Sequence, residues 1–259
     1  MVSLEKSISL VAATITDVVS LLDQIIANCI LKASRTGYFA ALYRKMTIGV
    51  QEGIGNGVFD DGSRMETLDV VFANRYLAAY NQFTNGEMPC KCWKTAFEAA
   101  VSDDLIVLQH LLLGMNAHIN LDLAIAAAQI STPETIGSLY NDYLKINTII
   151  AGFFKSVQSD LSKIAFPMRF IELVDPEQTN AVLNFSISKA REAAWANALL
   201  FCEAGNANET PLINTCDNVV DSVAQKILQP GAAASVLTNL VLRTEQKDVA
   251  QNIAFLNQD

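Results

Sequence analysis

Apolar side chains recur at intervals of three and four residues in every long segment of this chain. This spacing places them on one face of an α-helix. A first helix is expected over residues 3–33, where the apolar face comprises Leu10, Ile15, Val18, Leu22, Ile25, Ile26 and Cys29. Strand-like alternation and hairpin turns, which would indicate β-sheet, do not stand out in the sequence. The pattern predicts an all-α fold.

Helix-start and helix-stop residues divide the rest of the chain. Further helices are expected over residues 38–51, 63–83, 90–100, 104–129, 133–158, 175–202, 215–228 and 232–255. Ser63, with Glu66 three residues on, has the spacing of a capping box, and Asp103 is expected to cap the helix that follows it. The glycine-rich segment 53–57 and the segment 205–211 are predicted loops. Because no linker is long, we expect one domain over residues 1–259, a bundle of about eight helices with a buried central helix.

The segment Gln109–Leu123 holds both histidines of the chain. On a helix turning about 100° per residue, with His110 at 0°, His118 falls near 80° and Asp122 near 120°. Two asparagines, Asn116 and Asn120, form a second polar stripe, and apolar residues fill the remaining face. His118 and Asp122 are four residues apart, so their side chains can touch. We expect close helix packing at Gly114, between the two histidines.

Three interpretations of this polar helix remain open. A carboxylate beside an imidazole can orient it for proton transfer, which favours an acid–base or ligand-binding site with His118 and Asp122 as catalytic residues. The same pair could hold a metal, although His110 lies about 12 Å further along the axis. The third interpretation is a structural hydrogen-bond network, because buried polar groups need partners.

Two other segments contribute candidate substrate-binding residues. Asp69, Tyr76 and Tyr80 share one face of the helix over residues 63–83, with Arg75 directed elsewhere. Arg191 and Trp195 are four residues apart, and an arginine beside a tryptophan can grip a carboxylate or phosphate. Together with His110, Asn116 and Asn120, these residues are predicted to line a pocket. No metal ligand is assigned, because Cys90-Lys-Cys92 lacks a second metal-binding pair.

Composition restricts the classes of partner and compartment. The chain is 51% apolar and 17% charged, which excludes a disordered protein. Its 27 acidic and 18 basic residues give a net charge of −9, so nucleic acid and anionic membranes are unexpected partners. Polar residues interrupt the apolar stretch 105–130, which argues against a membrane span. The N-terminal segment lacks the basic start of a signal peptide, and five cysteines without a disulfide framework indicate a cytoplasmic protein. The apolar excess is compatible with a homodimer.

The segment Leu112–Leu123, LLGMNAHINLDL, resembles the signature of a bacterial family of unknown function, whose members carry a G-M-N-A-H-I-N-x-D-L block. The segment Phe72–Leu77 and the region of Trp195 are similar as well, so the resemblance covers the chain from about residue 35 onward. It implies that His118, Asn120 and Asp122 belong to the family's motif. It implies no activity and no cofactor.

The sequence thus predicts an enzyme or binder of a small, partly apolar molecule, with His118 as general acid or base and Asp122 orienting it. Lyase, cyclase or isomerase chemistry needs only such groups. One alternative is a metal-dependent hydrolase using His118, Asp122 and acidic residues from segment 61–69. The other is a non-catalytic helical interaction protein, in which the polar stripes provide packing specificity.

Overall fold

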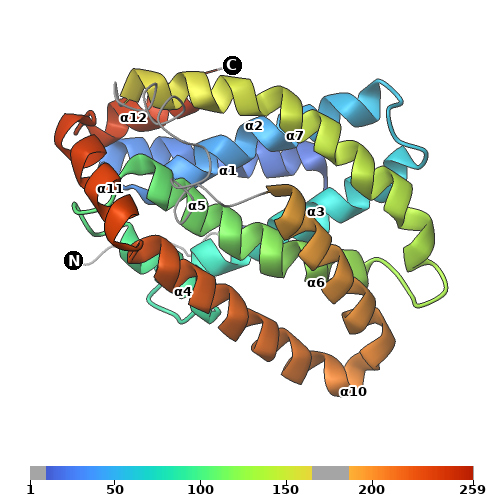
Figure 1. The fold of residues 1–259 in the computed structure, drawn as a ribbon. Coiled ribbons are helices and arrows are strands. Elements are labelled where there is room, and N and C mark those ends of the chain that lie inside the picture. The colour runs from blue at the N-terminus through green and yellow to red at the C-terminus, as the bar shows by residue number, and fades with distance from the viewer. Residues whose placement is uncertain (1–9, 165–186, 259) are drawn as a thin grey trace, which may run out of the picture.

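The computed structural model describes residues 10–164 and 187–258 (Figure 1). These residues form ten α-helices and one π-helical turn, without a strand among them. The elements in chain order are α1 (Ile15–Lys32), α2 (Thr36–Gly55), α3 (Gly62–Thr84), α4 (Lys91–Ala99), α5 (Val107–Ala117), the π-turn η1 (His118–Asp122), α6 (Leu123–Gln129), α7 (Ile136–Ile164), α10 (Ile187–Leu228), α11 (Ala232–Thr244) and α12 (Val249–Leu256). The all-α prediction is confirmed, and the expected count of about eight helices is too low.

The additional helices arise where predicted helices are interrupted. The expected helix over 104–129 starts only at Val107 and is divided by the π-turn. The expected helix over 232–255 is divided at Glu245, whose backbone is extended at φ −68° and ψ 139°. Residues 10–14 precede α1 without helical structure, and Thr14 caps that helix. Residues 3–9 of the predicted first helix, and 175–186 of a later one, lie outside the described residues.

The predicted loop 205–211 is instead part of α10. Only Gly205 leaves the helical conformation, with φ 62° and ψ 170°, and Pro211 lies inside the helix. A positive φ is cheap only for glycine, so Gly205 bends the chain without a long loop. Figure 1 shows the resulting elbow, from which two arms of α10 diverge.

The predicted buried central helix corresponds to α5, η1 and α6, which follow one another along one axis. They contact α2, α3, α4 and α10. By length and composition, Val107–Gln129 is the one helix among the described residues that could cross a membrane. In its most apolar window, however, 83% is buried inside the protein, as in the core helix of a soluble protein. Its apolar character therefore reflects burial against other helices.

Gly114 permits the close approach of α5 to α2. A Cβ atom at this position would lie 2.5 Å from two ring carbons of Phe39 and 2.8 Å from its Cβ. Such distances are far inside van der Waals contact, so no side chain fits. The predicted close packing at Gly114 is confirmed.

Three buried acidic residues from the C-terminal half of the chain accept backbone hydrogen bonds at the starts of helices in the N-terminal half. Asp142 of α7 accepts hydrogen bonds from the backbone N–H groups of Asp60 and Asp61, just before α3, at 2.7 and 2.9 Å. Asp217 of α10 accepts from the first two N–H groups of α4. Glu245 accepts from Val107 at the start of α5. Helix N-termini leave N–H groups unpaired, and here distant carboxylates satisfy several of them.

These caps correct two sequence predictions. The N-cap of α3 is Asp61, whose side chain accepts from the Arg64 N–H, and Ser63 already lies inside the helix. Asp103 does not cap α5 either. The helix starts at Val107, three residues later than predicted, and there Glu245 accepts the Val107 N–H. The cap of α3 is a local one, displaced by two residues from the prediction, whereas the acid that reaches the start of α5 is distant in sequence, which a local capping rule does not consider.

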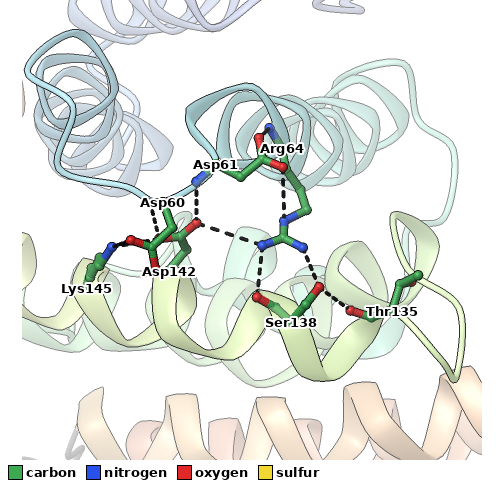
Figure 2. A network of polar contacts seen from close by, with 7 residues as sticks. All are labelled: Asp60, Asp61, Arg64, Thr135, Ser138, Asp142 and Lys145. Atoms are coloured by element: carbon green, nitrogen blue, oxygen red, sulfur yellow. Dashed lines mark hydrogen bonds and ion pairs between the residues drawn. The ribbon is translucent and has the colours of Figure 1, made fainter.

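Figure 2 shows the network around Asp142, which joins α7 to the loop before α3. Lys145 donates to Asp142 at 3.1 Å and Arg64 lies 3.9 Å from it. Arg64 also donates to the side chain and backbone carbonyl of Ser138. Burial raises the pKa of Asp142, but its hydrogen bonds with the Asp60 and Asp61 N–H groups and with Lys145 outweigh this effect and leave the pKa below its usual value.

Gly114→Ala should destabilise the protein by about 1–3 kcal/mol, since the new methyl group forces α5 and α2 apart. Urea unfolding measures this loss. Gly137→Ala is the matched control, because Gly137 is an exposed helical position with no atom within 4 Å of a Cβ there. It should be neutral or stabilise by up to about 1 kcal/mol. Equal stabilities of the two variants would contradict the packing role of Gly114.

Asp142→Asn should lower the free energy of unfolding by about 1–3 kcal/mol at pH 7, since the amide replaces a carboxylate that accepts hydrogen bonds from three donors. A carboxyl with a lowered folded-state pKa stabilises the fold above its unfolded pKa of about 4, and this contribution is lost as pH falls through the folded-state pKa. The difference between wild type and variant should therefore shrink as pH falls below about 4. Asp23→Asn, at an exposed ion pair with Arg44, should cost less than about 1 kcal/mol. A difference independent of pH would refute this account.

Candidate functional site

The carboxylate of Asp122 is the centre of a buried polar cluster. Its Oδ1 accepts a hydrogen bond from Arg75 Nε at 3.0 Å, and its Oδ2 accepts one from Trp93 Nε1 at 2.7 Å. His118 Nδ1 lies 3.2 Å from the same Oδ2. Asp122 is 1% exposed. Three elements supply the three donors: α3, α4 and η1. The predicted contact between His118 and Asp122 is confirmed.

The His118–Asp122 pair spans the whole π-turn. The N–H of Leu123 donates to the carbonyl of His118, five residues back, instead of four. Such a turn inserts one residue into the helix and changes the direction in which the following side chains point. Single π-turns occur frequently at functional sites. The polar pair therefore lies at the one place where the central helix departs from regular α-geometry.

Aromatic rings surround the imidazole of His118. Phe72 stacks on it at 3.6 Å between ring centroids and 9° between planes. Tyr43 meets it edge-on at 4.4 Å. Three more rings have their centroids within about 6 Å of the imidazole centroid: those of Phe39, Tyr76 and Trp93, at 5.6, 6.1 and 6.1 Å. The imidazole thus has an apolar, aromatic environment apart from its contact with Asp122.

This environment keeps His118 neutral at pH 7. Burial lowers its pKa, and the hydrogen bond with Asp122 opposes this effect without cancelling it. A carboxylate oxygen only accepts hydrogen bonds, so the contact with Asp122 requires the proton on Nδ1. The other ring nitrogen, Nε2, then carries a lone pair. Nε2 is buried and makes no hydrogen bond with the described residues.

Three further buried polar atoms, two of them on tyrosines whose rings contact His118, make no hydrogen bond within the described part of the chain. They are the hydroxyl oxygens of Tyr43 and Tyr76 and Oδ2 of Asp69. The hydroxyl of Thr47 lies near enough to Tyr43 to lower its pKa, although burial dominates and raises that pKa well above the usual value. The Tyr43 and Tyr76 ring centroids are 5.9 Å apart, and Asp69 interacts electrostatically with Tyr43.

Asp69 is also unusual in its protonation. Burial and, to a smaller extent, the charge of Glu66 raise the pKa of Asp69 to about 7. The neutral carboxylic acid is therefore populated near pH 7, and it can donate a hydrogen bond. Unpaired buried polar groups are costly, so His118 Nε2 and these three atoms together form a candidate ligand site.

The remaining predicted site residues lie elsewhere. Tyr80 is further along α3, with its hydroxyl 3.7 Å from Cys29 Sγ. His110 packs against Tyr38 at 5.7 Å, and burial, then the charge of Arg35, lowers its pKa to about 4. The structure thus brings His118, Asp122 and Tyr76 together, with Asp69 linked to them through Tyr43. Tyr80 contacts Tyr76 at 6.2 Å between ring centroids, but neither Tyr80 nor His110 has a hydrogen bond or ring contact with His118 among the described residues.

The two asparagines of the central helix have structural partners. Asn116 donates to the backbone carbonyl of Val220 on α10 at 2.9 Å, and Asn120 donates to Asn116. These bonds fix α10 on the central helix.

Arg191 and Trp195 form a separate cluster between α10 and α7. Arg191 lies over the ring of Tyr143 and donates to Asn147 and to the Tyr143 carbonyl. Trp195 packs against Tyr140 and Tyr143, each at 4.9 Å. Neither has a hydrogen bond or ring contact with the His118 cluster among the described residues.

Sequence reasoning missed several residues of the site. Arg75, expected to point away from the polar face of α3, is the cationic partner of Asp122. Trp93, Tyr43, Phe72 and Phe39 were not predicted either. Two general rules could have pointed to Arg75 and Trp93: a buried carboxylate needs a cation, and a buried indole needs a hydrogen-bond acceptor. Neither rule says which partner is chosen.

Among the described residues, the combinations of three or more potential metal ligands do not include His118 or Asp122. Both oxygens of Asp122 already accept hydrogen bonds, and the cation of Arg75 lies beside them. This arrangement gives the metal-hydrolase hypothesis no third ligand from the described part of the chain.

A double-mutant cycle measures the Trp93–Asp122 hydrogen bond. We expect a coupling free energy of about 1–3 kcal/mol between Trp93→Phe and Asp122→Asn in urea unfolding, because each change removes one side of the same charge-assisted bond. The chain's other tryptophan provides the control. Trp195→Phe and Asp122→Asn should be additive within about 0.5 kcal/mol. Additivity in both cycles would contradict the role of Asp122 as the centre of the cluster.

Comparison with known proteins agrees with the predicted resemblance to a family of unknown function. No curated protein and no solved structure matches the chain. A family of unknown function, DUF5995, matches residues 15–230, which include α1 to α7 and both arms of α10. The whole His118–Asp122 cluster lies inside the matched region. The chain therefore belongs to this family of unknown function.

Proposed function

We propose that this protein binds a small, partly apolar organic molecule beside His118, and that His118 accepts a proton from it. The observation that supports this proposal is the group of four buried polar atoms that have no hydrogen-bond partner among the described residues: His118 Nε2, the Tyr43 and Tyr76 hydroxyls, and Asp69 Oδ2. A ligand with a flat apolar body and a polar edge satisfies these atoms and packs against the surrounding rings.

The arrangement suits His118 to act as a base. A neutral imidazole with its proton on Nδ1 presents the Nε2 lone pair to the ligand. When Nε2 takes the proton, an imidazolium forms, and the adjacent Asp122 carboxylate stabilises it. Arg75 and Trp93 hold that carboxylate in place. They are positioning residues, since they act on the imidazole through Asp122.

Asp69 and the two tyrosines supply the complementary groups. With its pKa near 7, Asp69 can donate a proton or a hydrogen bond to the ligand, while the tyrosine hydroxyls, whose pKa values burial raises, remain neutral donors. A base and an acid on one ligand are the requirement for isomerase, lyase or cyclase chemistry.

Ligand entry requires a side chain to move, because His118 is 3% exposed. Phe72 covers one face of the imidazole and is itself partly exposed. Rotation of this ring would uncover that face of the imidazole to solvent or a ligand. Free thiols at all five cysteines support a protein of a reducing compartment such as the cytoplasm.

The test uses protein labelled with ¹⁵N-histidine and titrated with simple phenols, which combine a flat apolar ring with one acidic O–H. In the free protein, the His118 signals should show the neutral form with the proton on Nδ1, even at pH 6.5, where half of an exposed histidine is protonated. Binding should shift the His118 Nε2 signal, and His118→Gln should weaken it at least about tenfold.

His110→Gln is the matched control. His110 is the chain's other histidine, and it is also buried, with neither ring nitrogen hydrogen-bonded to any residue that the structure describes. This variant should bind the phenols like the wild type. If no phenol moves the His118 signals, and His118→Gln folds with unchanged stability, the cluster is a structural network and the protein is a non-catalytic helical interaction protein instead.

A further inference from the structure

Two cysteines and a distant aspartate meet where α4 contacts the second arm of α10. Cys90 is the N-cap of α4 and Cys92 lies in its first turn. Asp217 comes from α10, more than a hundred residues later. The sulfur atoms are 3.8 Å apart, and one ligand atom of each residue lies within 4.8 Å of the others. In the described part of the chain, no other histidine, cysteine or acidic side chains form a group of three this close.

We propose that Cys90, Cys92 and Asp217 bind a divalent cation of the zinc type. Two sulfurs bound to one tetrahedral ion at about 2.3 Å lie about 3.8 Å from each other. The separation observed between these thiols already has this value. Thiolate and carboxylate together are ligands that suit Zn²⁺. Three protein ligands leave one coordination position for solvent.

The cluster is built more rigidly than a chance meeting of side chains. Asp217 accepts hydrogen bonds from the Lys91 N–H at 2.8 Å and the Cys92 N–H at 3.0 Å. These bonds orient the carboxylate, as outer hydrogen bonds do in metal sites. Each carboxylate oxygen keeps a second lone pair for an ion.

Capping alone does not account for the thiols. Asp142 and Glu245 also accept backbone N–H groups at helix starts, yet neither belongs to a group of three potential metal ligands among the described residues. The side chain of Cys90 makes no capping hydrogen bond itself. The two sulfurs are therefore an addition to the cap, and they point to a ligand.

An ion can reach the cluster from solvent. Cys92 and Asp217 are buried, whereas Cys90 is partly exposed and forms the outer edge. On binding, the ion replaces the protons of the two thiols, and both protons leave to solvent. The occupied site would join α4 to α10. It would also anchor Trp93, the residue after Cys92, whose indole donates to Asp122.

The test is titration of the reduced protein with Co²⁺, a spectroscopic substitute for Zn²⁺, after mass spectrometry has shown all five thiols free. We expect one equivalent to produce thiolate-to-cobalt charge-transfer absorption in the near ultraviolet, and one equivalent of Zn²⁺ to remove it. Zn²⁺ alone should also raise the melting temperature, because it binds the folded state.

Cys90→Ser should abolish the charge-transfer band and the Zn²⁺-dependent rise in melting temperature, while its circular dichroism stays that of a folded helical protein. The matched control is Cys202→Ser, a partly buried thiol on the other arm of α10, outside the cluster. It should keep both signals. Absence of the band in the reduced wild type, or its persistence in Cys90→Ser, would overturn the proposal. Neither result depends on ligand binding at His118.

Discussion

The burial of one carboxylate, that of Asp122, constrains the centre of this protein. A charge removed from water costs several kcal/mol unless donors replace the lost hydration. Here the donors are a guanidinium, an indole and an imidazole from three different elements. All three must reach the same two oxygens, so the positions of α3 and α4 relative to the central helix follow from this one group.

The close approach at Gly114 completes the environment of that group. Without a side chain at Gly114, α2 packs directly on the central helix and brings Phe39 against it. Tyr43, one turn further along α2, then meets the edge of the imidazole. Packing excludes water from this region. Because burial disfavours the charged form of each group, it lowers the pKa of His118 and raises that of Asp69. Packing and protonation have the same cause.

Buried carboxylates at the edges of the bundle also need donors that replace their lost hydration. Asp142, Asp217 and Glu245 are buried acids, and each is satisfied by backbone N–H groups at the start of a helix. Each pairing links segments about eighty or more residues apart in the chain. An acid buried in this way stabilises both the helix start it caps and the contact between the two segments. Four polar atoms in and around the central cluster differ from this pattern, since His118 Nε2, the Tyr43 and Tyr76 hydroxyls and Asp69 Oδ2 are buried and have no partner among the described residues.

The sequence by itself determined the helical class, the approximate positions of most helices, the burial of the central one, the contact of His118 with Asp122 and the close packing at Gly114. Each depends on helical periodicity or on spacing of four residues, which are local properties. Only the tertiary structure decided that Arg75 and Trp93 hold Asp122, that Tyr80 and His110 lie away from His118, and that Asp217 joins Cys90 and Cys92. These pairings depend on which helices pack together, and a helical pattern shows which face is buried without showing what it is buried against. The same reason explains the helix starts, because the acids that cap α4 and α5 come from the far half of the chain.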